Sequence, residues 1–248
     1  MRIAIAGGTG TLGRRVAEEL RSRGHDVRAL SRASAEYRVD LTTGEGLGAA
    51  LEGCQVVIDV TNNSSRNAAQ TLVDGSRRLL VAERAAGVRH HVGVSIVGCD
   101  KVPMGYFQVK AEQERVVEQG PVPWSLIRAT QFHEYVATML DAGARWRILP
   151  VPRASLQTIA SAEVARVVAD VAVGVPLQRR IDVAGPEVAD ARELARTWRS
   201  VTRHRALLLP VPQPGKLGRA LRHGVLTAEQ PDVRGTTRFE EWLTAARQ

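Results

Sequence analysis

Cysteine is scarce in this chain, and long apolar runs are missing. The 248 residues include two cysteines, Cys54 and Cys99, which form neither a CxxC pair nor a metal-type spacing. A disulfide scaffold and a cysteine-based zinc site are therefore excluded. No stretch approaches the ~18 consecutive apolar residues of a membrane span, and the apolar run 3–6 is too short for a secretory signal. We expect a cytoplasmic protein with no membrane partner and no metal site.

Lysine and aromatic residues are also rare, although the chain is basic. Lysine supplies three of the 34 basic residues, aromatics make up 4%, and the formal net charge is +8. A basic balance can indicate nucleic-acid binding, but these arginines are scattered and no run of five occurs. We therefore expect no nucleic-acid partner. The summed positive field can still favour small anionic ligands.

The first 130 residues alternate between strand and helix patterns. Short apolar or β-branched runs predict strands, and apolar residues at helical spacing predict helices between them. The predicted strands are 2–6, 26–31, 39–41, 55–60, 91–97 and 124–128, and the predicted helices are 11–23, 46–51, 67–86 and 103–119. This alternation predicts an α/β protein with a doubly wound parallel sheet, the Rossmann fold.

Beyond about residue 130 prolines cluster and the alternation loosens. A helix over 161–173 and a strand over 180–183 can return to the sheet. We predict a dinucleotide-binding Rossmann core over 1–135, to which 161–184 return. Residues 136–160 and 185–248 would form a small, interleaved substrate-binding lobe. The outward-facing helices are compatible with either a monomer or a homodimer.

The most informative motif is a glycine-rich turn between the first strand and the first helix. Such glycines allow a tight turn and let a pyrophosphate approach the backbone, while the helix N-terminus offers free N–H groups. The strand–turn–helix context strengthens the motif, and no Gly-Lys-Ser/Thr follows that would indicate a Walker A loop. We predict that this turn binds a dinucleotide through Gly7, Thr9, Gly10, Thr11, Leu12 and Gly13.

The end of the second strand bears on the type of dinucleotide. NAD-binding proteins carry an acidic residue there, whereas this strand ends in Ser31 and Arg32. A guanidinium suits a 2′-phosphate, and Arg14 could help from the first helix, so the sequence favours NADP (NADPH) over NAD. The alternative is that both arginines are ordinary surface residues. Asp40, next to Leu41, could contact the adenine or cap a turn.

A tyrosine–lysine pair lies on the helix that follows the fifth strand. Tyr106 and Lys110 are four residues apart and so share one helix face. A nearby lysine favours the phenolate, and such a tyrosine can protonate a carbonyl oxygen as hydride arrives. Ser95, near the end of the fifth strand, could bind the same oxygen. The alternative is an amphipathic pair with no chemistry.

Together these motifs resemble the short-chain dehydrogenase/reductase superfamily, and within it the atypical NmrA-like, NAD(P)-binding group. The resemblance covers residues 1 to about 135 well. It is carried by the segments 6–13 (AGGTGTLG), 27–32 (VRALSR), 40–41 (DL), 56–59 (VVID), 92–95 (VGVS), 106–112 (YFQVKAE), 125–132 (SLIRATQF) and 161–165 (SAEVA).

The resemblance implies a dinucleotide across the carboxyl edge of the sheet. Thr61 and Asn62 would line its path, with Asp40 and Leu41 also at the cofactor, and Lys110 would bind the ribose. Ser95, Tyr106 and Lys110 would be the catalytic set. Phe132 and His133 would face the substrate, although for His133 an ordinary loop or helix-start position is equally compatible.

The sequence thus predicts an NADPH-dependent oxidoreductase acting on a small carbonyl, quinone or related molecule. Two alternatives stay open. One is a non-catalytic NAD(P) sensor that binds a protein partner, because some members of the group lack the tyrosine. The other is a redox-neutral enzyme that keeps its dinucleotide bound.

Overall fold

The computed structural model describes residues 1–102, 104–144 and 148–247, so the predicted helix start at Pro103 lies outside it. The chain divides into two compact units. The first comprises Met1–Ser95, Gly105–Arg128 and Ala162–Ile181, and the second Ile96–Met104, Ala129–Ser161 and Asp182–Gln248. The segment Ile96–Met104, which falls within the range predicted for the core, belongs to the second unit.

The first unit contains most of a parallel sheet and its flanking helices. Its elements are β1 Arg2–Ala6, α1 Thr11–Ser22, β2 Asp26–Leu30, α2 Leu47–Leu51, β3 Val56–Asp59, the π-helical turn η1 Gln70–Asp74, α3 Gly75–Ala86, β4 His90–Ile96, α4 Gly105–Glu118, β5 Trp124–Ala129 and α6 Ser161–Val173. The sheet continues through β8 Arg180–Ala184 and β11 Val233–Arg234, in the order β11-β8-β5-β4-β3-β1-β2. The predicted doubly wound parallel sheet is confirmed.

The parallel registers fix the carboxyl edge of this sheet. Ile3 pairs with Val27 of β2 on one side and with Val56 of β3 on the other. Because β2 and β3 flank β1 on opposite sides, the chain reverses its winding direction at β1. Such a switch point opens the crevice in which α/β proteins bind their ligands.

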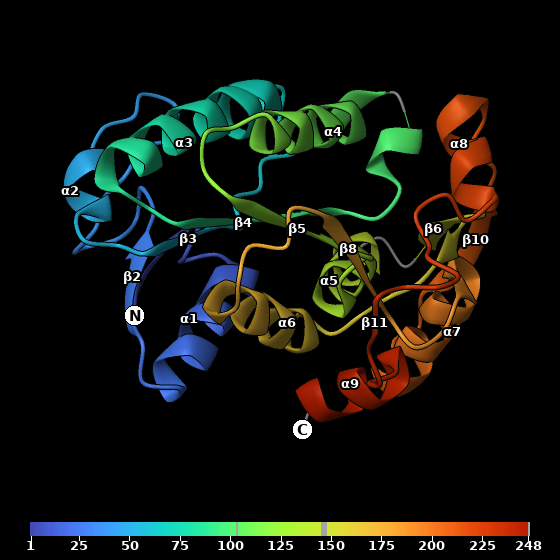
Figure 1. Ribbon diagram of the computed structural model, residues 1–248. Helices are drawn as coiled ribbons and strands as arrows, with labels where there is room; N and C mark the ends of the chain where they lie inside the picture. The colour runs from blue at the N-terminus through green and yellow to red at the C-terminus, as the bar shows by residue number, and fades with distance from the viewer. Residues whose placement is uncertain (103, 145–147, 248) are drawn as a thin grey trace. The chain divides into compact units, whose positions relative to one another are not determined.

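Helices cover both faces of the sheet in the first unit, with α3 and α4 over one face and α1 and α6 over the other (Figure 1). Apolar residues from the α1 side, including Val16 and Leu20, are fully buried. On the other side Leu51, Val57 and Leu79 belong to one buried cluster. Both faces of the strands are therefore buried, as a parallel sheet requires.

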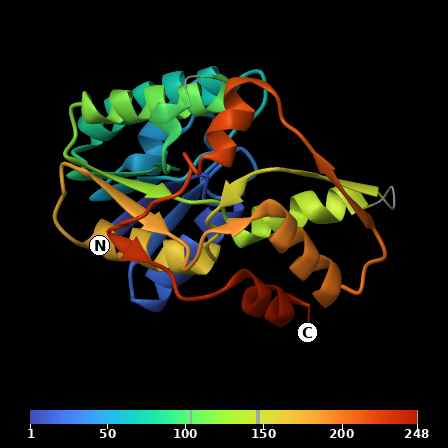
Figure 2. The ribbon, with the colours of Figure 1, turned by 90° about the vertical axis from the view of Figure 1, so that its right-hand side faces the viewer.

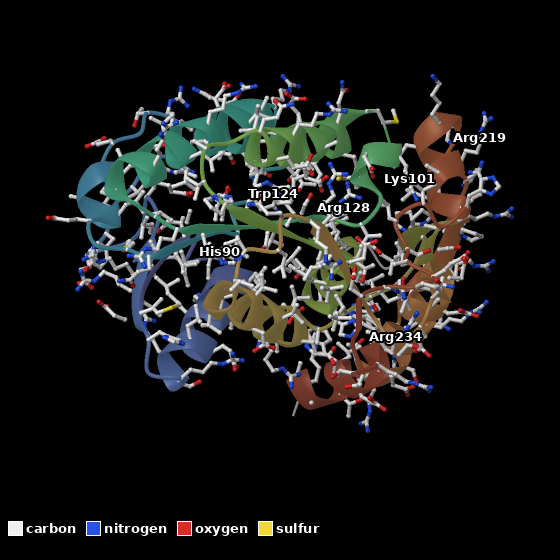
Figure 3. All side chains as sticks on the ribbon, in the orientation of Figure 1. His90, Lys101, Trp124, Arg128, Arg219 and Arg234 are labelled. Carbon is white, nitrogen blue, oxygen red and sulfur yellow. The ribbon has the colours of Figure 1, made fainter. Side chains whose placement is uncertain are left out.

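A buried ion pair attaches α4 to the sheet. Arg128 of β5 donates to both carboxylate oxygens of Glu114 at 2.9 and 2.6 Å, and Figure 3 shows Arg128 beneath α4. The two-pronged geometry fixes the orientation of the guanidinium as well as its position. This contact helps to fix the helix that carries Tyr106 and Lys110.

The prediction of a third strand over 39–41 is wrong. Within the segment Asp40 makes an isolated β-bridge with Glu45, and just before it Arg38 makes another with Ser31, so no ladder forms. The Asp40 carboxylate accepts from the Thr42 N–H and hydroxyl, and the Asp40 carbonyl accepts from the Gly44 N–H at 2.7 Å. These bonds curl the chain into a turn where a strand would stay extended. The predicted helix 67–86 is also subdivided, into η1 and α3.

The second unit has its own elements and its own core. They are the 3-10 turn η2 Cys99–Lys101, α5 His133–Ala144, β6 Ile148–Pro152, β7 Ser155–Leu156, β9 Ala189–Asp190, α7 Ala191–Val201, β10 Leu207–Val211, α8 Gly215–Arg222 and α9 Phe239–Ala246. Strand β10 pairs in parallel with β6, and β7 pairs antiparallel with β9. Figure 2 shows α5 beside α7. Their apolar faces enclose a core around Trp198, which is 1% exposed.

Candidate active site

The glycine turn folds tightly against its own strand and against two neighbours. The Gly7 N–H donates to the Leu30 carbonyl and the Gly10 N–H to the Gly7 carbonyl. Gly7 has a φ of +79°, a conformation that favours glycine. A Cβ on Gly8 would lie 2.7 Å from the Ala29 Cα. The turn is therefore a cradle that only small residues can form.

Helix α1 begins directly after this turn without a side-chain cap. Gly10 is its N-cap, and within the described chain no side chain bonds its first turn, which also contains no acidic residue. The N–H groups at such a helix start point outward together with the positive end of the helix dipole. Thr9 and Thr11 are exposed here, whereas Leu12 and Gly13 are buried. The cradle and the uncapped helix start fit a dinucleotide pyrophosphate.

We expect Gly13→Ala to weaken NADPH binding at least about tenfold, because its Cβ would lie 2.2 Å from the Gly7 carbonyl oxygen. The overlap is with backbone, so α1 must move away from the turn. Titration of NADPH by tryptophan fluorescence measures the effect. Gly48→Ala on α2 is the control, since its added Cβ has nothing within 4 Å. Equal affinity in both variants would show that the turn does not hold the cofactor.

The residues predicted to select the nucleotide lie just beyond β2, except Arg14, which lies on α1. Arg32 and Arg14 are both exposed, and Ser31 uses its hydroxyl oxygen to accept from the Ala33 N–H. Asp40 caps its own turn, and these bonds from Thr42 hold the pKa of the Asp40 carboxyl below its usual range. Leu41 is buried. The capping alternative therefore accounts for the Asp40 contacts, and its contact with adenine stays a prediction.

The tyrosine predicted to be catalytic lies at the same edge of the sheet. The Tyr106 hydroxyl donates to Asn62 Oδ1 at 2.5 Å, from α4 across to the loop after β3. Thr61 precedes Asn62 and lies against the glycine turn. The amide nitrogen of Thr61 would be 3.1 Å from a Cβ added to Gly7. The structure thus brings together the glycine turn, the loop with Thr61 and Asn62, and Tyr106.

Lys110 extends from the same helix into the interior. It is 2% exposed, and its ammonium donates to the Val94 carbonyl at 2.8 Å and to Gln113 Oε1 at 2.6 Å. The predicted catalytic Ser95, which follows Val94, is 5% exposed. Lys110 therefore connects α4 to the end of the strand that carries Ser95.

A buried polar network behind Lys110 was not predicted from the sequence. Gln113 donates to Asp59 Oδ2 at 3.2 Å and to the Ser76 hydroxyl at 3.0 Å. Asp59, 2% exposed, also accepts from the Ser76 hydroxyl at 3.0 Å and from the Thr61 N–H and hydroxyl at 3.0 and 2.6 Å. These donors satisfy the carboxylate, which would otherwise be costly to bury.

The network joins the lysine to the loop that carries Asn62. It runs from Lys110 through Gln113 and Asp59 to Thr61. A sequence signal for it exists, because Gln113 lies three residues after Lys110 and seven after Tyr106, on one face of α4. Asp59 is likewise a carboxylate at the end of an apolar strand.

The two residues predicted to face the substrate belong to the second unit. Phe132 makes an isolated bridge with Ile159. His133 is fully buried, its Nε2 lies 3.0 Å from the Thr237 carbonyl oxygen, and its ring packs on Phe239 and Trp242. His133 is also the first residue of α5, so the structure favours the helix-start alternative for it. Its role at a substrate, like that of Phe132, stays a prediction.

This geometry can perform two tasks in one place. The glycine cradle, with the helix start, can hold a dinucleotide at the β1 switch point. The Tyr106 hydroxyl, half-buried beside the cradle, can exchange a proton with a bound molecule. A parallel sheet with such a cradle at its switch point defines a dinucleotide-binding protein.

Comparison with known proteins identifies the class more narrowly. Residues 7–173 match the NAD(P)H-binding family, so this chain belongs to that family. A solved structure of an NADPH-dependent quinone oxidoreductase, QOR2 of Escherichia coli, superimposes with a TM-score of 0.81 over 99% of this chain and 100% of that one, at 18% identity. The likeness confirms the predicted Rossmann-type α/β fold.

Two curated relatives are photosystem II assembly factors named Ycf39. That of Trieres chinensis is 30% identical over 152 residues, which cover 54% of this chain and 47% of the relative. That of Synechocystis is 24% identical over 98% of this chain and 76% of the relative. The chain spans about half the length of several curated relatives it matches. In the described residues no helix is long and apolar enough to cross a membrane.

Proposed function

We propose that this protein is an NADPH-dependent oxidoreductase that reduces a small carbonyl, quinone or related molecule. The observation that carries the proposal is the Tyr106 hydroxyl, which donates to Asn62 beside the glycine cradle. A phenolic hydroxyl next to a dinucleotide site is the arrangement that carbonyl reduction needs. The likeness in fold to the NADPH-dependent QOR2 supports this reading.

Each residue of the set would have its own role. NADPH, when bound, supplies a hydride. Tyr106 would donate a proton to the substrate oxygen in place of its bond to Asn62, and Ser95 would bind the same oxygen. The Lys110 ammonium would bind the ribose hydroxyls and favour the phenolate form of the tyrosine. Gln113 and Asp59 would hold Lys110 in place through the buried network.

The test is the loss of NADPH absorbance at 340 nm over a panel of ketones, aldehydes, quinones and imines, with NADH in parallel. We expect turnover on at least one class and a preference for NADPH. Binding of NADPH without turnover on any class would contradict the proposed activity.

We infer that Arg32 sets the preference for NADPH, because it is exposed at the end of β2 and bonds no other described residue. Arg32→Ala is expected to weaken NADPH binding at least about tenfold, since a charge-assisted contact to the 2′-phosphate is lost, and to leave NADH binding unchanged. Isothermal titration of both dinucleotides measures this. Arg84→Ala, at an exposed position on α3, is the control. An equal loss for both dinucleotides would contradict the assignment.

A second candidate is a non-catalytic NAD(P) sensor that binds a protein partner. It is favoured by the curated relatives, whose name describes assembly factors. It predicts that partner binding depends on which dinucleotide is present, with no turnover in the panel. A redox-neutral enzyme would instead show dinucleotide that co-purifies and does not exchange.

A further inference from the structure

A hollow of about 410 Å³ lies within the second unit, and none of the residues predicted to bind the dinucleotide lines it. It is formed by the β6–β7 connection, the start of α7 and the end of α8. Arginine dominates its lining, which comprises Arg153, Ala154, Ser155, Asp190, Arg192, Glu193, Arg196 and Arg222. Four guanidinium groups thus face two carboxylates, which leaves an excess of two positive charges.

Both carboxylates already serve the helix start. Asp190 accepts from the Arg192 N–H at 2.8 Å, and Glu193 accepts from the Asp190 N–H at 3.1 Å. This reciprocal capping box satisfies the first turn of α7. The N-terminus of α7 is therefore already satisfied, and an anion in this hollow would be attracted by the arginines.

The four arginines differ from others in the chain. In the described part of the chain no carboxylate lies within 4.0 Å of them, whereas Arg23, Arg128 and Arg180 all make ion pairs. Of the four, only Arg222 bonds another described residue through its side chain, from Nη1 to the Gln213 carbonyl oxygen at 2.9 Å. Their charges therefore repel one another around a hollow, which a bound anion would relieve.

The surrounding sequence is acid-poor. Between positions 192 and 222 there are eight basic residues and one acidic residue, Glu193. Arg192, Arg196 and Arg199 follow one stripe of α7, at spacings of four and three. Figure 3 shows nitrogen-tipped side chains gathered along α7 and α8. The positive charge of the unit is thus concentrated where the hollow lies.

We propose that this arginine-lined hollow binds a compact phosphate-bearing anion. Planar guanidinium groups bind phosphate oxygens in pairs, and Arg192 and Arg196, one helical turn apart, can share one group. The volume admits a group larger than a single phosphate. The same chemistry is offered by a soluble phosphorylated molecule and by a phospholipid headgroup.

The test titrates inorganic pyrophosphate into the full chain at low salt, with NADPH saturating so that the glycine cradle is occupied. A pocket variant carries Arg192→Gln and Arg196→Gln. A matched variant carries Lys216→Gln and Arg219→Gln, which remove two charges from exposed positions of α8 outside the hollow. A second arm measures co-sedimentation with phosphatidylglycerol and phosphatidylcholine vesicles. Thermal melting checks that both variants fold.

We expect pyrophosphate binding to weaken at least about tenfold in the pocket variant and to stay within about twofold in the matched variant. The site holds a lipid headgroup if wild type binds phosphatidylglycerol vesicles but neither pyrophosphate nor phosphatidylcholine vesicles. In that case the pocket variant should lose vesicle binding and the matched variant should keep it. Equal binding by wild type and the pocket variant, or no binding of either probe to wild type, would overturn the proposal. None of these outcomes depends on turnover of NADPH.

Discussion

Tyr106→Phe is expected to lower kcat by at least about 10²-fold, the lower range for loss of a general acid. The change removes one oxygen and with it the bond to Asn62. It leaves the glycine cradle and the Lys110 network in place, so the Kd for NADPH should stay within about twofold. Steady-state rates at 340 nm and fluorescence titration of NADPH measure the two effects separately.

A matched control is Tyr135→Phe, because Tyr135 is 60% exposed on α5 of the second unit. It should retain wild-type turnover and stability. A Tyr106→Phe enzyme that turns over normally would sink the proposed mechanism. A variant that loses NADPH affinity and turnover together would instead give Tyr106 a binding role.

The largest loss of stability is expected from Glu83→Ala. Glu83 of α3 and His91 of β4 are both fully buried, and His91 Nδ1 lies 2.8 and 3.0 Å from the two carboxylate oxygens. Removing one partner leaves a polar group buried without its bond. We expect the free energy of unfolding to fall by about 3–5 kcal/mol, measured by urea denaturation. Glu83→Gln, which retains an acceptor oxygen, should lose less.

The Glu83–His91 pair should also make the free energy of unfolding depend on pH, and this dependence tests the pair more specifically than the loss of stability does. Burial raises the pKa of Glu83, and although burial alone would lower the pKa of His91, the bond and charge of Glu83 raise it above 6.5. As pH rises above 6.5, the unfolded histidine loses its proton while the folded pair keeps it. The free energy of unfolding should therefore fall, by up to about 1.4 kcal/mol per pH unit.

In Glu83→Gln the sign of this slope should reverse. Buried His91 then keeps only the smaller effect of the Asp59 charge, which burial outweighs, so its pKa falls below the unfolded value. Its stability contribution is therefore lost as pH drops below 6.5. The difference between wild type and variant isolates the pair from other titrating groups. A variant whose stability follows the wild-type pH profile would contradict the assignment.

Local chemistry accounts for what the sequence could predict. The glycine turn could be predicted from the sequence because its backbone packing requires glycine. A side chain at Gly7, Gly10 or Gly13 would meet backbone atoms. The helix 161–173 has an apolar face continuous enough to mark both ends, and α6 has those bounds. The tyrosine–lysine spacing is likewise a property of one helix. Each of these signals lies within about a dozen residues.

Features that depend on contacts between distant segments could not be predicted. Glu83 and His91 meet because α3 packs on β4, and Gln113 meets Asp59 across 54 positions of sequence. The sequence separation of the two partners marks neither contact, although the place of Gln113 on the Lys110 face of α4 could have indicated one member of the second pair. The prediction of a strand over 39–41 was wrong for another reason. The valine and leucine on either side of Asp40 are typical of a strand, but the Asp40 side chain caps a turn.

Transfer of label from NADPH deuterated at C4 tests the central claim most directly. The substrate is the ketone, aldehyde or imine that the panel identifies, and the product is analysed by mass spectrometry. We predict one deuterium on the reduced carbon, delivered from only one of the two C4 positions, and a rate that falls with Tyr106→Phe. Unlabelled product, or NADPH that binds saturably and is oxidised by no compound in the panel, would contradict the account.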